Sequence, residues 1–151
     1  MKQKMVFHLF ALVCNVGMAF AQAPLKESLF AGAFRGHVAE LYIQTHQQDC
    51  TNAPYYLGMV RFKSDDTTEA VWRKFNIFAN DANGFLLVDD HWNVGRFQHY
   101  IYLEQKGPVL TGFLKASEGD QEPLKLERKT TVTDFGPYHK EMLAIDMHDD
   151  C

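Results

Sequence analysis

The strongest constraint on the fold of this chain is a series of short segments in which apolar and polar residues alternate. In segment 37–45, for example, Ala39, Leu41 and Ile43 would share one face of a strand, opposite polar side chains. Turn signals separate these segments, and Asn83-Gly84 is a strong one because both residues tolerate positive φ. The pattern predicts seven strands, at 37–45, 55–62, 69–78, 85–88, 96–104, 109–115 and 124–129.

The short connections between these segments favour antiparallel neighbours, and a meander of such strands hides its edges by closing into a barrel. We therefore predict an all-β fold: an antiparallel meander of about seven to eight strands that closes into a small barrel. Apolar residues recur near helical spacing from Tyr138 to His148, after Gly136-Pro137, which predicts a short C-terminal helix packed against the barrel. The lead segment, Leu25 to Phe34, is expected to begin with a helical turn.

The first residues have the layout of a secretory signal peptide. Lys2 and Lys4 precede an apolar run from Met5 to Phe20, and Ala19-Phe20-Ala21 places small residues at the two positions that a signal peptidase reads. A retained membrane anchor is the alternative, but the run is short beside the roughly 20 residues of a bilayer span. We expect a signal peptide at 1–21, a single domain at 22–151, and a periplasmic or secreted protein that is not an integral membrane protein after cleavage.

The predicted export determines which cysteines remain and how they are expected to pair. Cys14 would leave with the signal peptide; lipid attachment to it is the alternative, but Leu12-Val13 stand where small residues are expected. Cys50 and Cys151 then form an even pair in an oxidising compartment, which predicts a disulfide between them. Two separate thiols, or a link from Cys151 to a second chain, remain as alternatives.

The charge balance limits the partners. The chain has 15 Lys and Arg against 19 Asp and Glu, and a formal net charge of −4 with His neutral. Loss of Lys2 and Lys4 makes the remaining domain more acidic. An acidic surface disfavours nucleic acid and anionic membrane surfaces, so we expect neither as a partner.

One local motif and the overall plan point to a known architecture. Gly32-Ala33-Phe34 stands just before the first predicted strand, and a meander, a C-terminal helix and a tail cysteine that could reach the barrel follow it. This plan resembles a lipocalin-like (calycin-type) β-barrel, in which a Gly-x-Trp occupies the equivalent position. Phe34 replaces the tryptophan, the predicted strand count is one short of eight, and the chain is smaller than most lipocalins. The resemblance concerns architecture, and it implies no ligand and no binding residue.

The densest polar cluster is a predicted loop, Asp89-Asp90-His91-Trp92-Asn93. Asp89, Asp90 and His91 offer oxygen and nitrogen ligands for a divalent cation, or a His–Asp pair for acid–base work. Their spacing matches no established metal loop, so a solvated turn with Trp92 folded onto the barrel rim is the favoured interpretation. The acidic tail 146–151, with His139, is a second and weaker candidate. The chain has no nucleophile motif and no nucleotide-binding motif, so we predict no catalytic residue and no cofactor.

Aromatic residues offer the better candidates for recognition. His99 alternates with apolar residues and would be a polar contact inside the barrel if the barrel is hollow. Tyr42, Trp72, Tyr100 and Tyr102 alternate against the apolar face, so they form an outward aromatic stripe suited to protein recognition unless both faces are covered. Ordinary cross-strand pairing, with Lys and Arg stems over the rings, is the favoured interpretation. The binding candidates are therefore Tyr42, Trp72, Trp92, His99, Tyr100 and Tyr102.

These observations favour an exported, non-enzymatic binding protein. It would hold a small apolar ligand in the barrel or a protein partner on its aromatic face. The first alternative is an inhibitor or immunity protein that blocks a secreted or periplasmic hydrolase. The second is a metal-dependent enzyme that uses the loop from Asp89 to His91. A filled barrel with the four aromatic residues exposed together would favour protein binding.

Overall fold

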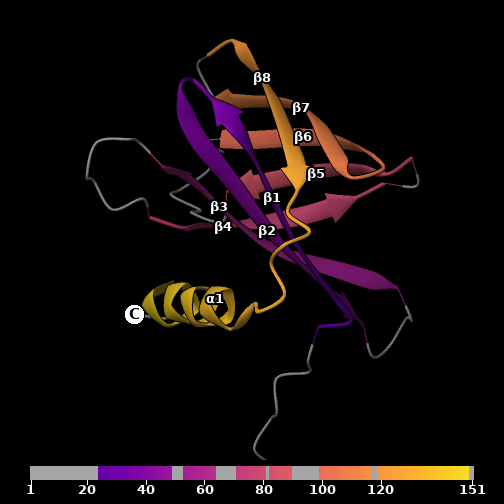
Figure 1. Ribbon diagram of the computed structural model, residues 1–151, viewed down its shortest axis with the longest axis vertical. Helices are drawn as coiled ribbons and strands as arrows, with labels where there is room; N and C mark the ends of the chain where they lie inside the picture. The colour runs from indigo at the N-terminus through magenta and orange to yellow at the C-terminus, as the bar shows by residue number, and fades with distance from the viewer. Residues whose placement is uncertain are drawn as a thin grey trace, which may run out of the picture.

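The computed structural model describes residues 24–48, 53–63, 71–80, 82–89, 99–116 and 119–149. Eight strands and one helix lie in these residues (Figure 1). They are β1 (Lys26–Phe34), β2 (His37–Gln47), β3 (Pro54–Lys63), β4 (Arg73–Ala79), β5 (Gly84–Asp89), β6 (His99–Lys106), β7 (Val109–Ala116), β8 (Gln121–Arg128) and α1 (Gly136–Asp149).

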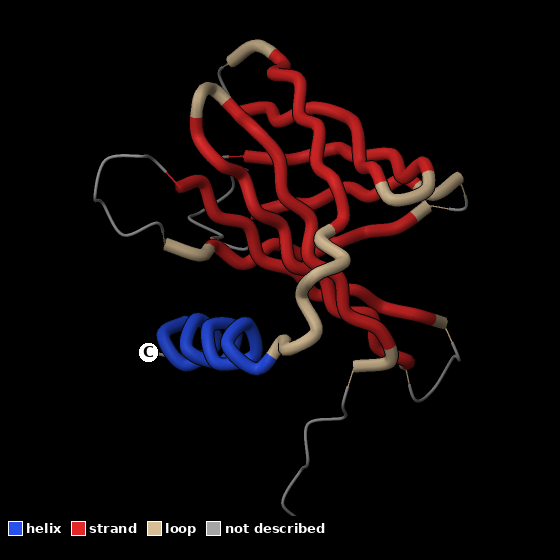
Figure 2. Tube along the Cα trace, in the orientation of Figure 1, coloured by secondary structure: helices blue, strands red, loops and turns tan. Residues whose placement is uncertain are grey.

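The strands form a closed barrel in sequence order, and each strand is antiparallel to the next (Figure 2). The barrel closes where β1 meets β8, through the pairs Phe30↔Arg128 and Ala31↔Glu127. This confirms the predicted all-β antiparallel meander with a C-terminal helix, and it is consistent with a lipocalin-like architecture. Within the described residues, no helix has the length and apolarity needed to cross a bilayer.

A single apolar cluster occupies the barrel interior, and every strand contributes to it. The alternation read from the sequence accounts for it: Ala39, Leu41 and Ile43 of β2 all point inward and are buried. Aromatic side chains extend the cluster at its ends, as Phe34 and Phe62 do with ring centroids 5.1 Å apart. Burial of this kind of apolar surface is the main stabilising contribution to a domain of this size.

The segment before the first predicted strand is itself a strand, β1, and not the start of a helix. Leu25 to Phe34 was expected to begin with a helical turn, but β1 pairs with β2 along its whole length, from Lys26↔Thr45 to Phe34↔His37. The alternation is blurred here because both faces of β1 are covered. Phe30 points into the barrel, whereas Leu29 packs in a second cluster on the outer side of the barrel. A strand buried on both faces gives a continuous apolar run, which periodicity alone does not separate from a helix.

Two local details fit the barrel closely. Asn83 has a φ of 61° in the turn between β4 and β5, which confirms the predicted hairpin signal, and the Asn80 side chain accepts a hydrogen bond from the Gly84 N–H at 2.8 Å. Gly32 lies where β1 approaches β8, and a Cβ atom there would clash with the carbonyl oxygen of Lys125. The glycine of Gly32-Ala33-Phe34 is therefore required by the close approach of two backbones.

The helix lies outside the barrel, beside the wall that includes β1 to β4 (Figure 1). A segment without strand or helix joins it to β8 (Figure 2). The predicted helix from Tyr138 to His148 is confirmed, with two further residues before it and one after it. Asp134 Oδ1 accepts a hydrogen bond from the Gly136 N–H at 2.9 Å, which satisfies one of the backbone donors left free at a helix start.

Candidate functional site

The outer surface of the barrel has two unlike faces. On the first, the barrel wall and α1 enclose a set of apolar residues that we call the covered cluster, and further residues of α1 and of the preceding segment pack around it. Tyr42 lies at its centre, fully buried, with its ring stacked on Tyr138 and Phe135 at centroid distances of 5.1 and 5.8 Å. The covered cluster consists of Leu29, Tyr42, Met59, Trp72 and Met142.

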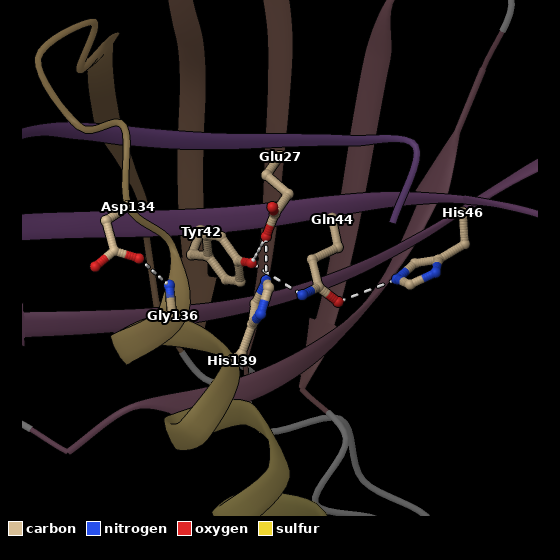
Figure 3. Close-up of polar contacts among 7 residues, drawn as sticks. All are labelled: Glu27, Tyr42, Gln44, His46, Asp134, Gly136 and His139. Atoms are coloured by element: carbon tan, nitrogen blue, oxygen red, sulfur yellow. Dashed lines mark hydrogen bonds and ion pairs between the residues drawn. The ribbon is translucent and has the colours of Figure 1, made fainter. Parts of the chain in front are cut away.

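A chain of polar contacts runs along the edge of the covered cluster (Figure 3). The Tyr42 hydroxyl donates to Glu27 Oε1, and His139 Nε2 of α1 forms an ion pair with the same oxygen. Gln44 Nε2 donates to the Tyr42 hydroxyl at 2.9 Å, and His46 Nε2 lies 3.0 Å from Gln44 Oε1. Three elements therefore meet at the Glu27 carboxylate of β1: β2 contacts it through Tyr42, and α1 contacts it through His139. Gln44 and His46 continue the chain of contacts along β2.

Alternation along β2 explains how this chain assembles. Tyr42, Gln44 and His46 are two residues apart, so they project from the same outer face of the strand. Glu27 lies directly opposite Gln44 in the register of β1 and β2. Gln44 and His46 are both buried although they face outward, which is unusual for polar side chains and is offset by their hydrogen bonds.

Burial also changes the acid–base behaviour of these groups. Burial raises the pKa of the Tyr42 hydroxyl strongly, and its hydrogen bond to the Glu27 carboxylate raises it further. Burial lowers the pKa of His46 below its ordinary value of 6.5, because the imidazolium is poorly solvated there. Tyr138 also has a raised pKa, mainly because it is buried, with a further contribution from the nearby Glu40.

The second face is the part of the outer surface formed by β3 to β7, and it is open. Four residues of neighbouring strands pair directly across it: Phe78 with Leu86, Leu86 with Tyr102, and Tyr102 with Phe113. We call these four residues the outer row. Phe78 is 60% exposed and Leu86 is 38% exposed, and the other two are partly exposed.

Aromatic contacts extend the outer row on both sides. Tyr102 and Tyr100 of β6 both contact Phe113, with ring centroids 5.7 and 6.1 Å apart. Tyr56 pairs with Ile77, so the next positions of β3 and β4 are Tyr55 and Phe78, both exposed. Tyr55 also stacks on His46 at a centroid distance of 5.1 Å, so the stripe begins beside the polar chain of the first face. The result is an apolar stripe across β3 to β7, longer than the single exposed apolar residues that are ordinary on protein surfaces.

The structure separates the four aromatic residues that were predicted to form one exposed stripe. Tyr42 does face outward, as predicted, but it is fully buried under α1, and Trp72 is 6% exposed. Tyr100 and Tyr102 lie on the open face instead. The four residues are therefore not exposed together, because α1 covers one wall of the barrel, and the stripe was expected only if that face is uncovered.

The remaining candidates are placed as follows. Asp89 ends β5 and is buried, so it does not lie in a solvated loop. His99 begins β6 opposite Ala116. Asp90, His91 and Trp92 lie outside the described residues, as do Cys50, Cys151 and the segment 1–21, so the predicted metal loop, disulfide and signal peptide stay predictions.

Sequence reasoning missed Glu27, Gln44, His46 and His139 as a group. Glu27 and His139 are 112 positions apart in the chain, and no local motif links them. A partial signal was present in β2, where Gln44 and His46 follow Tyr42 with the spacing of one strand face. Only the position of α1 shows that this face is buried.

In the described part of the chain, no three His, Cys, Asp or Glu side chains come together as a metal site would need. The geometry provides a hydrogen-bonded attachment for α1 on one face and an exposed apolar stripe on the other. Comparison with protein-family models, with curated proteins and with solved structures finds no match for this chain.

Proposed function

We propose that this chain is an exported, non-enzymatic binding protein that recognises a protein partner through the outer row. The supporting observation is that Phe78, Leu86, Tyr102 and Phe113 are direct cross-strand neighbours and remain at least partly exposed. Aromatic and large aliphatic side chains in such a patch are the usual anchors of protein interfaces.

The packed interior of the barrel favours binding on the outer surface rather than binding of a ligand inside the barrel. Inward side chains from all eight strands pack into one buried cluster, with Leu87, Leu103 and Leu110 fully buried in it. A small apolar ligand would need an enclosed cavity of about 300 Å³ or more in this space. Of the two forms of binding expected from the sequence, recognition of a protein on the outside is therefore the better supported.

Rigid aromatic residues are well suited to this role. Tyr102 is held by its hydroxyl, which donates to Glu104 Oε1 at 3.1 Å, and by its ring contact with Phe113. A side chain that is already ordered loses less conformational entropy when a partner binds. The lipocalin-like relationship belongs to the same proposal, and the order of the strands supports it.

The test is affinity capture with the secreted, tagged chain from a periplasmic extract or culture medium, compared across two variants. Phe78→Asp places a charge at the 60% exposed residue of the outer row and should abolish capture of any partner that uses this row. Val38→Ser is the matched control, because Val38 is a 44% exposed apolar strand residue outside the outer row. Equal capture by both variants would contradict the proposal, and so would a ligand that copurifies with the barrel and is unaffected by Phe78→Asp.

A further inference from the structure

One carboxylate, that of Glu27, receives polar contacts from both the barrel and α1. Glu27 Oε1 accepts from the Tyr42 hydroxyl of β2 and from His139 Nε2 of α1, and His139 makes the ion pair that joins helix and barrel. We propose that α1 is an acid-released cover: protonation of the Glu27 carboxylate detaches the helix and exposes the barrel side of the covered cluster.

The direction of the hydrogen bonds makes Glu27 the critical group. Gln44 donates to Tyr42 and Tyr42 donates to Glu27; with its proton on Nε2, His46 donates to Gln44. Every donor in the chain therefore points toward the carboxylate. A protonated carboxyl group carries a donor of its own and no charge, so it can no longer serve Tyr42 and His139 together as an ionised acceptor.

The other charged groups near α1 do not replace this pair. Glu40 is already paired with Lys63 at 3.0 Å and with Arg61, whose guanidinium also lies 4.3 Å from the Trp72 ring. Lys140 and Glu141 of α1 are exposed. The titratable and charged groups that face the helix attachment are Glu27 from β1, Glu40, Tyr42 and His46 from β2, Tyr55, Arg61 and Lys63 from β3, Lys74 from β4, and Asp134, Tyr138 and His139 from α1 and the segment before it.

Acid does not create a compensating contact at His46. Burial is the main influence on its pKa and lowers it, the nearby Glu27 carboxylate raises it, and His139 lowers it. Protonation of both histidines would place two positive charges near each other as the Glu27 charge is lost. A proton on His139 alone keeps the ion pair with Glu27, so the attachment weakens only when the carboxylate itself takes up a proton.

The barrel does not need the helix to stay closed. The seam between β1 and β8 is made by backbone pairs, and the backbone N–H of Lys129 donates to the Leu29 carbonyl at 2.8 Å, before α1 begins. The interior cluster contains no residue of α1. Elements that depend on a few side-chain contacts open more easily than the core of a domain, so α1 can leave while the barrel remains folded.

Trp72 provides the readout, because it is buried in the covered cluster and makes an edge contact with Tyr138 of α1 at 5.8 Å. A Trp92→Phe background leaves Trp72 as the single tryptophan of the two in the chain. Acrylamide quenching of its fluorescence is measured from about pH 7.5 down to about pH 4, with far-UV circular dichroism recorded on the same samples. Quenching should increase with acid while the strand signal persists.

Glu27→Gln keeps the shape of the side chain and removes its charge. It should expose Trp72 at pH 7.5 and abolish the pH response, with the detached population raised about tenfold or more. Glu104→Gln is the matched control, because Glu104 accepts from Tyr102 in the same kind of pair on the open face. His139→Ala removes the helix side of the ion pair, and its side chain is 40% exposed, so the substitution disturbs the fold less. It should give the same result as Glu27→Gln, and it keeps the test valid if Glu27→Gln folds poorly.

Three results would overturn the proposal. Quenching of Trp72 could be the same at both ends of the pH range. The strand signal could be lost together with the protection of Trp72, which would mean that the whole domain unfolds. Glu27→Gln and His139→Ala could both respond to pH as Glu104→Gln does, which would show that the Glu27–His139 pair does not hold the helix.

Discussion

Two tyrosine–glutamate pairs stand on the outer surface of the same barrel, and they differ in almost every physical respect. Tyr42 is fully buried and donates to Glu27 under α1, whereas Tyr102 is partly exposed and donates to Glu104 on the open face. Both hydroxyls have a raised pKa, but burial is the main cause for Tyr42 and the hydrogen bond to Glu104 is the main cause for Tyr102. The same chemical pair joins α1 to the barrel on one face and is part of an exposed apolar stripe on the other.

The comparison shows that the sequence position of an aromatic residue decides which way it points, while a distant element decides whether it is exposed. Tyr42 and Tyr102 both alternate with core residues along their strands. Only Tyr42 lies where the C-terminal helix returns to the barrel. The two faces should therefore respond very differently to matched substitutions.

The largest expected difference is between Tyr42→Ala and Tyr102→Ala. Tyr42→Ala removes a fully buried ring that stacks on Phe135 and Tyr138, and should lower the free energy of unfolding by about 3–5 kcal/mol. Tyr102→Ala removes a ring that water already reaches, so its effect should be much smaller. Urea denaturation followed by circular dichroism measures both, and equal losses would show that the two faces are not energetically distinct.

A second comparison uses neighbouring residues of α1. Met142 is buried in the covered cluster, while Leu143 is 58% exposed. Met142→Ala should lower the free energy of unfolding by about 2–3 kcal/mol because it leaves a cavity beneath the helix. Leu143→Ala should change it by about 0.5 kcal/mol or less. If the two variants are equally stable in the same urea titration, α1 does not pack as described.

Removal of the hydroxyl alone sharpens the comparison further. Tyr42→Phe leaves Glu27 and Gln44 without the hydroxyl partner in a buried setting, and should cost about 1–3 kcal/mol of folding stability. Tyr102→Phe loses a hydrogen bond at an exposed site, where water takes the place of the hydroxyl. Thermal unfolding of the two variants should show a clear decrease in Tm for the first and little change for the second.

The smallest expected effect is the contribution of His46 to the pH dependence of stability. Because burial lowers its pKa in the folded state, the unfolded chain binds a proton at higher pH than the folded protein does. Its contribution is therefore complete above the ordinary value of 6.5 and is lost as the pH falls through the lower folded value. His46→Gln should flatten the stability curve below pH 6.5, and a curve as steep as that of the parent protein would contradict this assignment.

The barrel and the helix could be predicted from the sequence because their signals are local. Alternation in β2, the Asn83 turn and the helical spacing after Pro137 each depend on a few neighbouring residues. β1 was missed because its two buried faces remove the alternation. The division of the outer surface could not be predicted, since the pairing of Glu27 with His139 and the covering of Tyr42 depend on contacts between the two ends of the domain.

Footprinting of aromatic side chains in solution tests the contrast between the two faces most directly. The folded chain is exposed briefly to hydroxyl radicals at neutral pH, and mass spectrometry then measures the modification of each aromatic residue. Phe78 and Tyr102 should be modified readily, while Tyr42 and Trp72 should be protected until the protein is unfolded. Equal modification of Tyr42 and Tyr102 in the folded protein would contradict the account, because it would mean that α1 does not cover its face of the barrel.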